Sequence, residues 1–451
     1  MSGRMTLGSL FVLAALVPGL SSAQTGGYGP SGGPPGPWPP SATSPVGPQG
    51  SGCPLPPQGG SGRTIYEVLP DDPGLLYADS PLENFLEDVF RHAYFRSEYL
   101  LWRATPPGNT LLGGTPPAGY LSTVPTATTP GAPANSFSIP VSSLLTQPGV
   151  AIEPSLAGFD IRNQNGYRGT FGLLVGPGTF EAAAFIMQNT TNRFDGTSLI
   201  RQEILPDPAA IPPTLGTPGI FIGQPITVAG TPLTMLYTQS YEAIMKTGIW
   251  GSEANYIFSA PNAGTGDPIT ISPLVGVRYL NYRESLLQSG MYDFVTDATT
   301  NPVTTEQDSR SIYASSNNNF YGPQFGVRAE VNVSRVTLGA EPKIMFGVNS
   351  YTAALNTNNI PFDDPATNTP LSFHKKATTF GPVADLKLYS RIAVSQYVHV
   401  YAAYNLMWAG NLSRPYNNIS YNAPTGAADV FATTFTETII QGLSVGGEIR
   451  Y

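Results

Sequence analysis

The chain has a single cysteine, Cys53, and few charged residues among its 451 positions. One cysteine excludes an internal disulfide and a metal site built from cysteines. Charged residues make up only 12% of the chain, against a usual share of about 25% in soluble proteins. The formal net charge is −8 and no basic run occurs, so the electrostatic signature of nucleic-acid binding is missing. This composition favours a membrane barrel over a cytosolic enzyme and predicts no nucleic-acid partner.

Long hydrophobic runs are also absent. After the N-terminus, no apolar run approaches the roughly 20 residues that a membrane-spanning helix needs. The N-terminus itself has the pattern of an export signal, with Arg4, an apolar core over residues 10–16 and small residues before a cleavage site at Gln24. We therefore predict a signal peptide over residues 1–23. If the exported protein spans a membrane, it must do so with strands.

Residues 24–78 are predicted to be a disordered linker followed by an irregular approach segment. Residues 24–62 are almost entirely Gly, Pro and Ser, and such a composition cannot bury a core. Residues 79–93 predict a short amphipathic helix, because Pro81 stands at a helix start and apolar residues recur at helical spacing from Leu82 to Phe90. Three placements of this helix stay open: against the periplasmic mouth of a barrel, as a plug in that mouth, or packed on the barrel wall.

The clearest strand pattern lies in residues 321–348. Apolar side chains alternate with polar or small ones up to residue 333, a tight turn follows, and the alternation resumes as far as residue 348. Successive side chains of a strand point to opposite faces, so one face of this hairpin carries no charge. The other face carries Arg328, Glu330, Glu341 and Lys343. Such a hairpin fits either a soluble sheet with a polar outer face or a membrane barrel with a polar lumen.

The rest of the sequence favours the barrel. It contains about ten strand-like segments, an even number, each near the roughly 9–11 residues of a tilted membrane strand. Short and long connections alternate, as periplasmic turns and extracellular loops do in outer-membrane barrels. The short ones lie at Gly176, Ala260, Asn332 and Ser390, and the long ones begin at Arg103, Asn189, Ser285, Asn349 and Gly410. We predict an all-β protein in which residues 94–451 form a closed, antiparallel, up-and-down transmembrane β-barrel with long extracellular loops.

Charged residues within these segments fall almost entirely on one face. Since an Arg or Lys that faces the middle of a bilayer costs about 2–4 kcal/mol, this sorting is expected if the charged face lines the lumen. The predicted lumen-lining residues are Arg96, Glu98, Arg168, Glu181, Glu253, Arg278, Arg328, Glu330, Glu341, Lys343, Asp385, Lys387, Glu448 and Arg450. Aromatic residues near the strand ends predict interfacial girdles: Trp102, Tyr167, Tyr279, Tyr282, Tyr321, Trp408 and Tyr451.

Three motifs in order resemble one known family over residues 94–451. They are Ser97-Glu98-Tyr99-Leu100-Leu101-Trp102, Trp250-Gly251-Ser252-Glu253-Ala254-Asn255 and Gly276-Val277-Arg278-Tyr279-Leu280. The sequence is similar in them to the putative beta barrel porin-7 family of planctomycete-type outer-membrane proteins. The resemblance implies an outer-membrane barrel. In addition, the C-terminal Tyr451 resembles the aromatic signal that barrel-insertion machinery recognises.

We therefore expect an outer-membrane protein of a diderm bacterium that is a porin or narrow pore with a structural or surface-display role. About ten strands leave little lumen, and balanced inward charges would fill it, so we expect little or no conductance. Expected partners are outer-membrane lipid, the insertion machinery, small polar solutes and surface-layer components. We expect no catalytic, cofactor-binding or metal site. The enzymatic alternative is an omptin-like hydrolase with a rim site near Asp363, Asp364 and His374, and a purely structural or adhesive barrel is the other.

Overall fold

The computed structural model describes residues 92–114, 135–139, 149–159, 164–201, 219–228, 230–260, 269–297, 304–361, 369–423 and 427–450. All described residues lie within one compact unit. The predicted signal peptide and linker lie outside the described residues. So does the predicted helix over residues 79–93, apart from its last two positions, where His92 is in a turn and Ala93 begins a strand.

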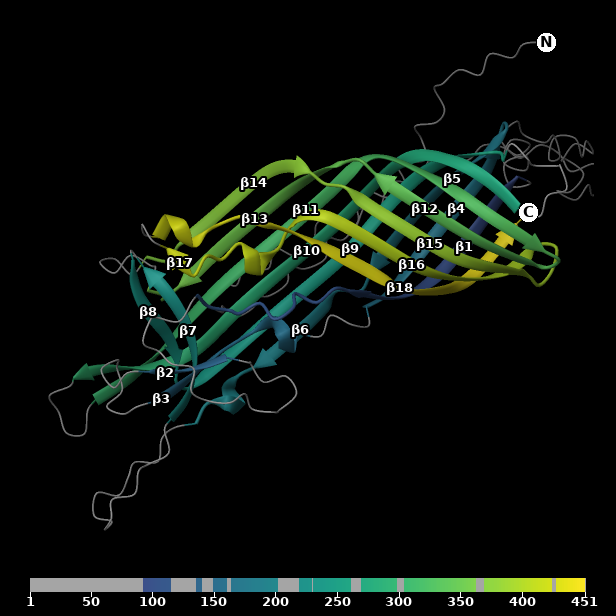
Figure 1. The fold of residues 1–451 in the computed structure, drawn as a ribbon. Helices are drawn as coiled ribbons and strands as arrows, with labels where there is room; N and C mark the ends of the chain where they lie inside the picture. Colours follow the sequence, from purple (N-terminus) through teal and green to yellow (C-terminus); the bar gives the residue numbers. More distant parts are fainter. Residues whose placement is uncertain are drawn as a thin grey trace, which may run out of the picture. The chain divides into compact units, whose positions relative to one another are not determined.

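Ten antiparallel strands form a closed ring, which confirms the predicted number of strands. Each pairs with the next along the chain, and the last pairs with the first, so no edge is left open in the ring. This is the predicted up-and-down order. The strands, drawn in Figure 1, are β1 (Ala93–Ala104), β4 (Gln164–Val175), β5 (Gly178–Met187), β9 (Ser240–Phe258), β10 (Ile269–Asp297), β11 (Thr304–Val333), β12 (Val336–Met345), β15 (Val383–Ala393), β16 (Val398–Ser413) and β18 (Phe435–Arg450).

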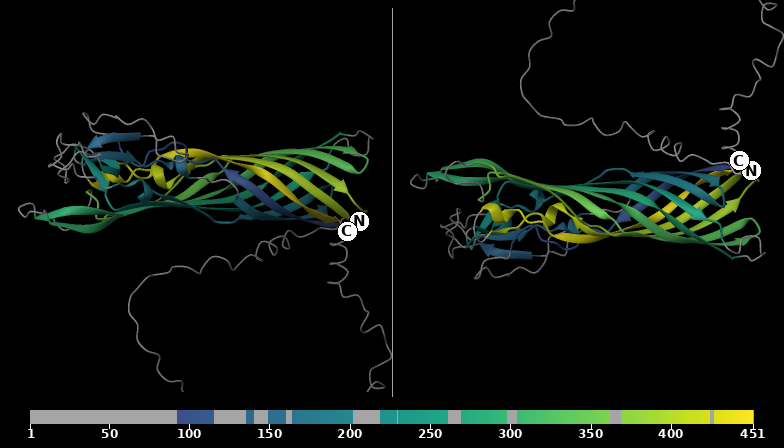
Figure 2. Two further views of the ribbon diagram at one scale, coloured as in Figure 1. Left: turned by 90° about the horizontal axis from the view of Figure 1, so that it is seen from below. Right: turned by 90° about the horizontal axis from the view of Figure 1, so that it is seen from above.

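The two ends of the ring differ. At one end, which we call the turn end, tight connections join β4 to β5 at residues 176–177, β11 to β12 at 334–335 and β15 to β16 at 394–397. Positive φ angles at Gly176 (58°) and Ser334 (56°) make two of these turns sharp. The opposite end, the loop end, carries the long connections. Figure 2 shows the ring strands crossing from one end to the other in two further views.

Alternation along the ring strands produces an apolar outer face. On β1, the outward Phe95, Tyr99 and Leu101 are about half exposed, while Leu100 and Trp102 are buried. The same alternation runs through the other ring strands, where large apolar side chains remain exposed. A contiguous belt of this kind is far larger than the exposed apolar patches of soluble monomers, so it marks a surface that another apolar phase covers.

Several strands continue past the belt toward the loop end. β6 (Thr190–Asp195) follows β5, β13 (Val348–Asn358) follows β12, and β14 (Ser372–Phe380) precedes β15. All three extend the 13-stranded sheet beyond the ring. Breaks at residues 188–189, 346–347 and 381–382 separate ring from extension. On the outer face, Tyr321, Val348 and Phe380 form an apolar row where this extension begins.

This extension corrects the prediction that the long polar segments from Ser285 and Asn349 are loops. Instead, β10 and β11 form one hairpin of 29 and 30 residues, and the segment from Asn349 contains most of β13 and part of β14. The prediction is wrong because the extension has Ser, Thr and Asn on its outer face, a composition that is also typical of loops. Backbone pairing does not require apolar side chains, so a polar ladder can continue outside the belt.

A second, five-stranded sheet occupies the other long connections near the loop end of β10 and β11 (Figures 1 and 2). Its strands are β2 (Asn135–Ile139), β3 (Gly149–Glu153), β7 (Gly219–Val228), β8 (Thr231–Tyr237) and β17 (Asn422–Ala423). Short 3₁₀ turns at Leu156–Gly158, Thr197–Leu199, Pro415–Asn417 and Ala427–Val430 link these parts. We call this sheet, the turns and the strand extensions the head.

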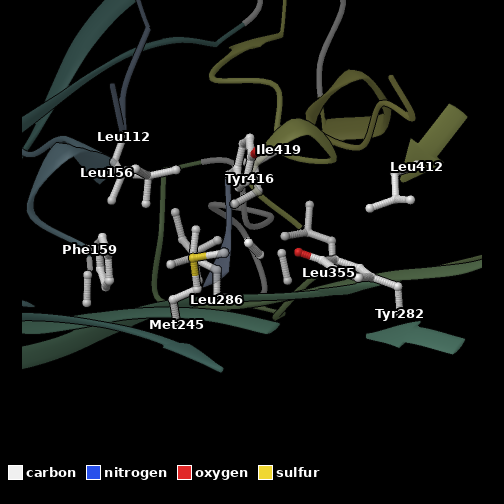
Figure 3. Close-up of a cluster of buried hydrophobic side chains, with 14 of the residues drawn as sticks. Leu112, Leu156, Phe159, Met245, Tyr282, Leu286, Leu355, Leu412, Tyr416 and Ile419 are labelled. Atoms are coloured by element: carbon white, nitrogen blue, oxygen red, sulfur yellow. The ribbon is translucent and has the colours of Figure 1, made fainter. Parts of the chain in front are cut away.

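The head has its own hydrophobic core, seen in Figure 3. Leu156 and Ile419 from the connections face Met245, Leu286 and Leu355 from the strand extensions, and all five are buried. A short polar bridge crosses the same interface, where Gln224 of β7 donates hydrogen bonds to the carbonyl of Leu112 (2.7 Å) and to the side chain of Gln288 on β10. The head therefore packs as a folded layer over the loop end of the strands.

Two of the predicted girdle residues face the interior of the ring and not its outer surface. Trp102 and Tyr282 are 3% and 0% exposed, because both occupy inward positions of their strands. In contrast, the predicted girdle residues Tyr167 and Tyr321 stand exposed on the outer face. Tyr279, also predicted, packs on the exposed Trp250 with ring centroids 4.9 Å apart. A position near a strand end does not by itself place an aromatic residue in the girdle. Successive side chains alternate between the two faces, so whether the position is odd or even along the strand decides which face it occupies.

We predict that Leu286→Ala destabilises the head by about 2–5 kcal/mol, because it leaves a cavity in a packed core. The measurement is limited proteolysis and hydrogen exchange of the detergent-solubilised protein, in which head peptides should lose protection. Leu338→Ala, on the outer face of the ring, is the matched control and should leave the head unchanged. Equal effects of the two variants would contradict a separately packed head.

Glu153 of β3 is a buried acid at 0% exposure, and neither carboxylate oxygen has a hydrogen-bond partner in the described part of the chain. Burial raises the pKa of Glu153 to about 7. Between its ordinary value of 4.5 and about 7, the folded head therefore holds a proton that the unfolded chain has released. Stability conferred by this proton is complete below about pH 4.5 and is lost as the pH rises toward 7.

We predict that Glu153→Gln stabilises the head at pH 8 and flattens the dependence of its stability on pH between about 4.5 and 7. One proton contributes a slope of at most about 1.4 kcal/mol per pH unit. Protease resistance of the head, measured across this range for both proteins, is the readout. Parallel pH profiles for the wild type and the variant would contradict the assignment.

Candidate functional site in the ring interior

The inward face of the ring carries a network of charged side chains that meet across the interior. Arg278 of β10 bonds Glu253 on the neighbouring β9 (Nε–Oε2 3.1 Å) and also Asp385 on β15 (Nη2–Oδ2 2.7 Å). Likewise, Arg328 of β11 bonds Glu181 on β5 at 2.9 Å. Because β10 and β15, like β11 and β5, are not neighbours, these side chains can meet only through the inside of the ring.

Lys343 on β12 is the centre of this network. Its ammonium lies 2.8 Å from a carboxylate oxygen of Glu253, 3.1 Å from Glu341 and 3.7 Å from Asp385. Glu341 in turn accepts a hydrogen bond from Arg328 Nε at 2.6 Å and lies 3.4 Å from the ammonium of Lys387. Most of these charges thus have more than one opposite neighbour, which is the arrangement that offsets the cost of removing ions from water.

A second part of the network joins β1, β4, β16 and β18. Arg96 contacts Glu448 at 3.1 Å and Glu98 at 3.2 Å, and its guanidinium stacks 4.4 Å above the ring of Tyr401. Glu98 accepts a hydrogen bond from the hydroxyl of Ser444 at 2.7 Å. A planar guanidinium between carboxylates and an aromatic face satisfies both its charge and its apolar surface.

The remaining charges join the same network at its margins. Arg168 donates to the side chain of Asn405 at 2.9 Å and lies over the ring of Trp102. Glu330 accepts a hydrogen bond from Tyr389 at 2.6 Å. Arg450, the most exposed member with 40% of its side chain accessible, bonds Glu448 at 2.6 Å.

All fourteen residues that the sequence singled out as lumen-lining are thereby located at inward positions of the ring strands, and the ion pairs bring them together. Seven are basic and seven are acidic, so the set is electrically balanced. Deep in the network, the cavity among Arg168, Glu253, Arg278 and Lys343 has a volume of about 20 Å³. This volume is enough for about one water molecule.

Sequence reasoning missed Arg391 and the pair of Glu284 with Arg414. Arg391 lies in β15, which runs further than predicted, and inward alternation from Lys387 through Tyr389 would have found it. Glu284 and Arg414 form a buried bidentate pair at 2.8 and 2.6 Å. No strand pattern could have joined these two, because Arg414 lies in a connection and reaches the interior only through the folded head.

Above the ions, toward the loop end, uncharged polar side chains close the interior. Asn318 of β11 donates to the carbonyl of Ser413 on β16 at 2.8 Å and accepts from Asn349 on β13 at 2.9 Å. All three residues are 0% exposed. Along β10, Arg278 faces the ion network, Tyr282 donates a hydrogen bond to Glu284 in the region where Glu284 pairs with Arg414, and Leu286 faces the hydrophobic core of the head.

The candidate rim residues are not brought together by the described structure. His374 is exposed on β14, opposite Ala354 on β13, whereas Asp363 and Asp364 lie outside the described residues. Within the described ranges, no group of three or more His, Cys, Asp or Glu side chains is placed to hold a metal ion. The described residues also include no helix that is both long and apolar enough to cross a membrane.

Comparison with known proteins gives one family. A family model described as putative beta barrel porin-7 matches residues 94–451. No curated protein matches the sequence. Among solved structures, the fold is similar to the outer membrane protease OmpT of Escherichia coli, with 11% identity, a TM-score of 0.38, and coverage of 80% of this chain and 97% of that one.

Two other similar structures are the toluene transporter TodX of P. putida and a FadL homologue of Pseudomonas aeruginosa. TodX is 6% identical, with a TM-score of 0.22 and coverage of 80% of this chain and 90% of that one. The FadL homologue is 9% identical, with a TM-score of 0.23 and coverage of 80% of this chain and 89% of that one. At TM-scores this low, we draw no argument about function from these three structures.

We predict that Glu341→Ala destabilises the ring by about 3–5 kcal/mol, because it leaves buried Arg328, Lys343 and Lys387 without a shared carboxylate. Unfolding by urea in detergent micelles, followed by heat-modifiable gel mobility, measures the loss. Glu242→Ala is the matched control, since it breaks the exposed pair of Glu242 with Arg193 and should cost less than about 1 kcal/mol. Equal losses would show that the interior ions are not a structural network.

Proposed function

Because this chain belongs to the putative beta barrel porin-7 family and is an outer-membrane β-barrel protein, we propose that it acts there as a plugged barrel that presents its head at the cell surface. The filled interior is the observation that carries this proposal. A solute pore needs a continuous water path, and about 16 strands are usual for an open channel. This ring has ten strands.

The dimensions of the apolar belt support a transmembrane position. On β11, outward apolar side chains run from Tyr321 to Val333. At about 3.3 Å per residue and a tilt of about 40°, such a stretch of about 13 residues spans roughly 30 Å, close to the thickness of a bilayer core. The polar extensions beyond Tyr321 then stand in water.

Three layers fill the path from the turn end to the loop end. The first is the balanced ion network, the second the amides and hydroxyls around Asn318, and the third the apolar core around Leu286. Water and ions could cross the first layer only by separating ion pairs and could cross the third only by unpacking a core. We therefore propose that the interior charges hold the barrel together and do not select solutes.

The short turns at one end support the orientation. In outer-membrane barrels the short turns face the periplasm and the long connections face outward. We accordingly place the turn end in the periplasm and the head outside the cell, where a rigid folded layer can contact surface components. The proposal assigns no enzymatic activity to the protein.

Purified protein in planar bilayers is expected to give no stable open-channel current, while a 16-stranded porin reconstituted in the same way serves as the positive control. Head-core variants such as Leu286→Ala should increase only transient events. Large, stable currents or rapid liposome swelling with the wild-type protein would overturn the plugged barrel and favour the narrow pore.

The orientation is tested by cysteine labelling of intact cells in a Cys53→Ser background. We expect Ser309→Cys, on the exposed face of the β11 extension, to react with a membrane-impermeant maleimide. Ser334→Cys, in the β11–β12 turn, should react only after the outer membrane is permeabilised. The reverse pattern would place the head in the periplasm.

A further inference from the structure

Two cations stand side by side on the outer face of β9 and β10, on the head side of the apolar belt. Lys246 on β9 lies opposite Ser285 of β10. Arg283 on β10 lies opposite Gly248 of β9, so the two cations are diagonal neighbours on one face of the sheet. Both side chains are exposed. Because like charges at neighbouring positions repel each other, the pair favours an anion between them.

The position of the Arg283 side chain depends on a glycine of the neighbouring strand. A Cβ at Gly248 would lie 2.7 Å from Arg283 Nε and 2.5 Å from Asn189 Oδ1, so the guanidinium crosses β9 where that strand has no side chain. Arg283 Nη2 then donates a hydrogen bond to Asn189 Oδ1 at 3.2 Å. A guanidinium has five N–H donors, and the remaining ones of this exposed group are available to a further acceptor.

The carboxylate that precedes Lys246 on this face of β9 does not neutralise the pair. It belongs to Glu242, four residues further toward the loop end, and it bonds Arg193 of β6 at 2.6 Å. On the other side of the pair, β11 places the uncharged Asn317 opposite Arg283. Within the described part of the chain, neither Lys246 nor Arg283 has an ion pair, so the patch keeps its positive charge.

The two cations lie just beyond an aromatic pair that marks the membrane interface. On the same face, four residues toward the turn end, Trp250 follows Lys246 on β9 and Tyr279 precedes Arg283 on β10, and their rings pack 4.9 Å apart. At about 3.3 Å per residue and a tilt of about 40°, four residues correspond to roughly 10 Å along the membrane normal. Long Lys and Arg side chains shorten this distance by bending toward the headgroups.

We propose that Lys246 and Arg283 bind the phosphate of a lipid headgroup in the leaflet next to the head, with the acyl chains of that lipid on the apolar belt beside Trp250. The guanidinium can bind two phosphate oxygens through parallel N–H groups, and the ammonium adds a point charge. A lipid is favoured over free phosphate because the site is continuous with the lipid-facing belt. The inference rests on the proposed function in one respect: with the head outside the cell, this is the outer leaflet.

Fluorescence quenching of Trp250 in the full-length protein, reconstituted in phosphatidylcholine vesicles, tests the proposal. The chain has four tryptophans, and Trp38→Phe with Trp408→Phe leaves Trp250, which is 42% exposed, and Trp102, which is buried inside the ring. The quencher is either brominated phosphatidic acid, which carries a phosphate monoester, or brominated phosphatidylcholine. We expect the phosphatidic acid to bind beside Trp250 at least about fivefold more strongly, as is typical of a basic residue near an anionic lipid surface.

Lys246→Gln with Arg283→Gln should remove this preference. Lys375→Gln with Lys376→Gln, which removes the same charge from exposed positions of β14, is the matched control and should keep it. Equal quenching by the two brominated lipids, an equal loss in the control variant, or displacement of the lipid by excess inorganic phosphate would overturn the proposal. The vesicles carry the quencher in both leaflets, so the result is independent of the orientation that cysteine labelling tests.

Discussion

Compensation of buried charge is the constraint on which this structure depends. An isolated ion in a low-dielectric interior costs several kcal/mol, and the ring encloses fourteen predicted charges and Arg391. Their cost is offset because most carboxylates contact two or more cations and several guanidinium groups also stack on aromatic rings. Lys343, for example, touches three carboxylates from three strands. The same network fixes which strands face each other across the ring.

The membrane imposes the complementary constraint on the outer face. Hydrocarbon offers no hydrogen bonds, so every backbone group at that depth must pair within the ring, and closure of β18 on β1 leaves no edge. Once the chain passes the apolar row of Tyr321 and Phe380, water can satisfy the backbone, and the ring need not stay closed. There the strands break, extend and accept a second sheet, whose core at Leu286 depends on ordinary hydrophobic packing.

These two environments explain which parts of the fold could be predicted. In the ring, strict alternation forces charged side chains to one face, so positions such as Arg278 and Glu341 could be assigned from the sequence. Polar strands in the head gave no such signal, and the β10–β11 hairpin was therefore predicted to end too early. Arg414 could not be linked to Glu284 at all, since no local period connects residues 130 positions apart.

The sequence by itself determined the all-β class, the ten-strand up-and-down order and the face to which each ring residue belongs, because a period of two is a local property of the chain. Only the tertiary structure decided which charges pair across the interior and that the long connections fold into a head. These features depend on closing the ring, which brings together residues that are distant in the sequence, such as Arg96 and Glu448.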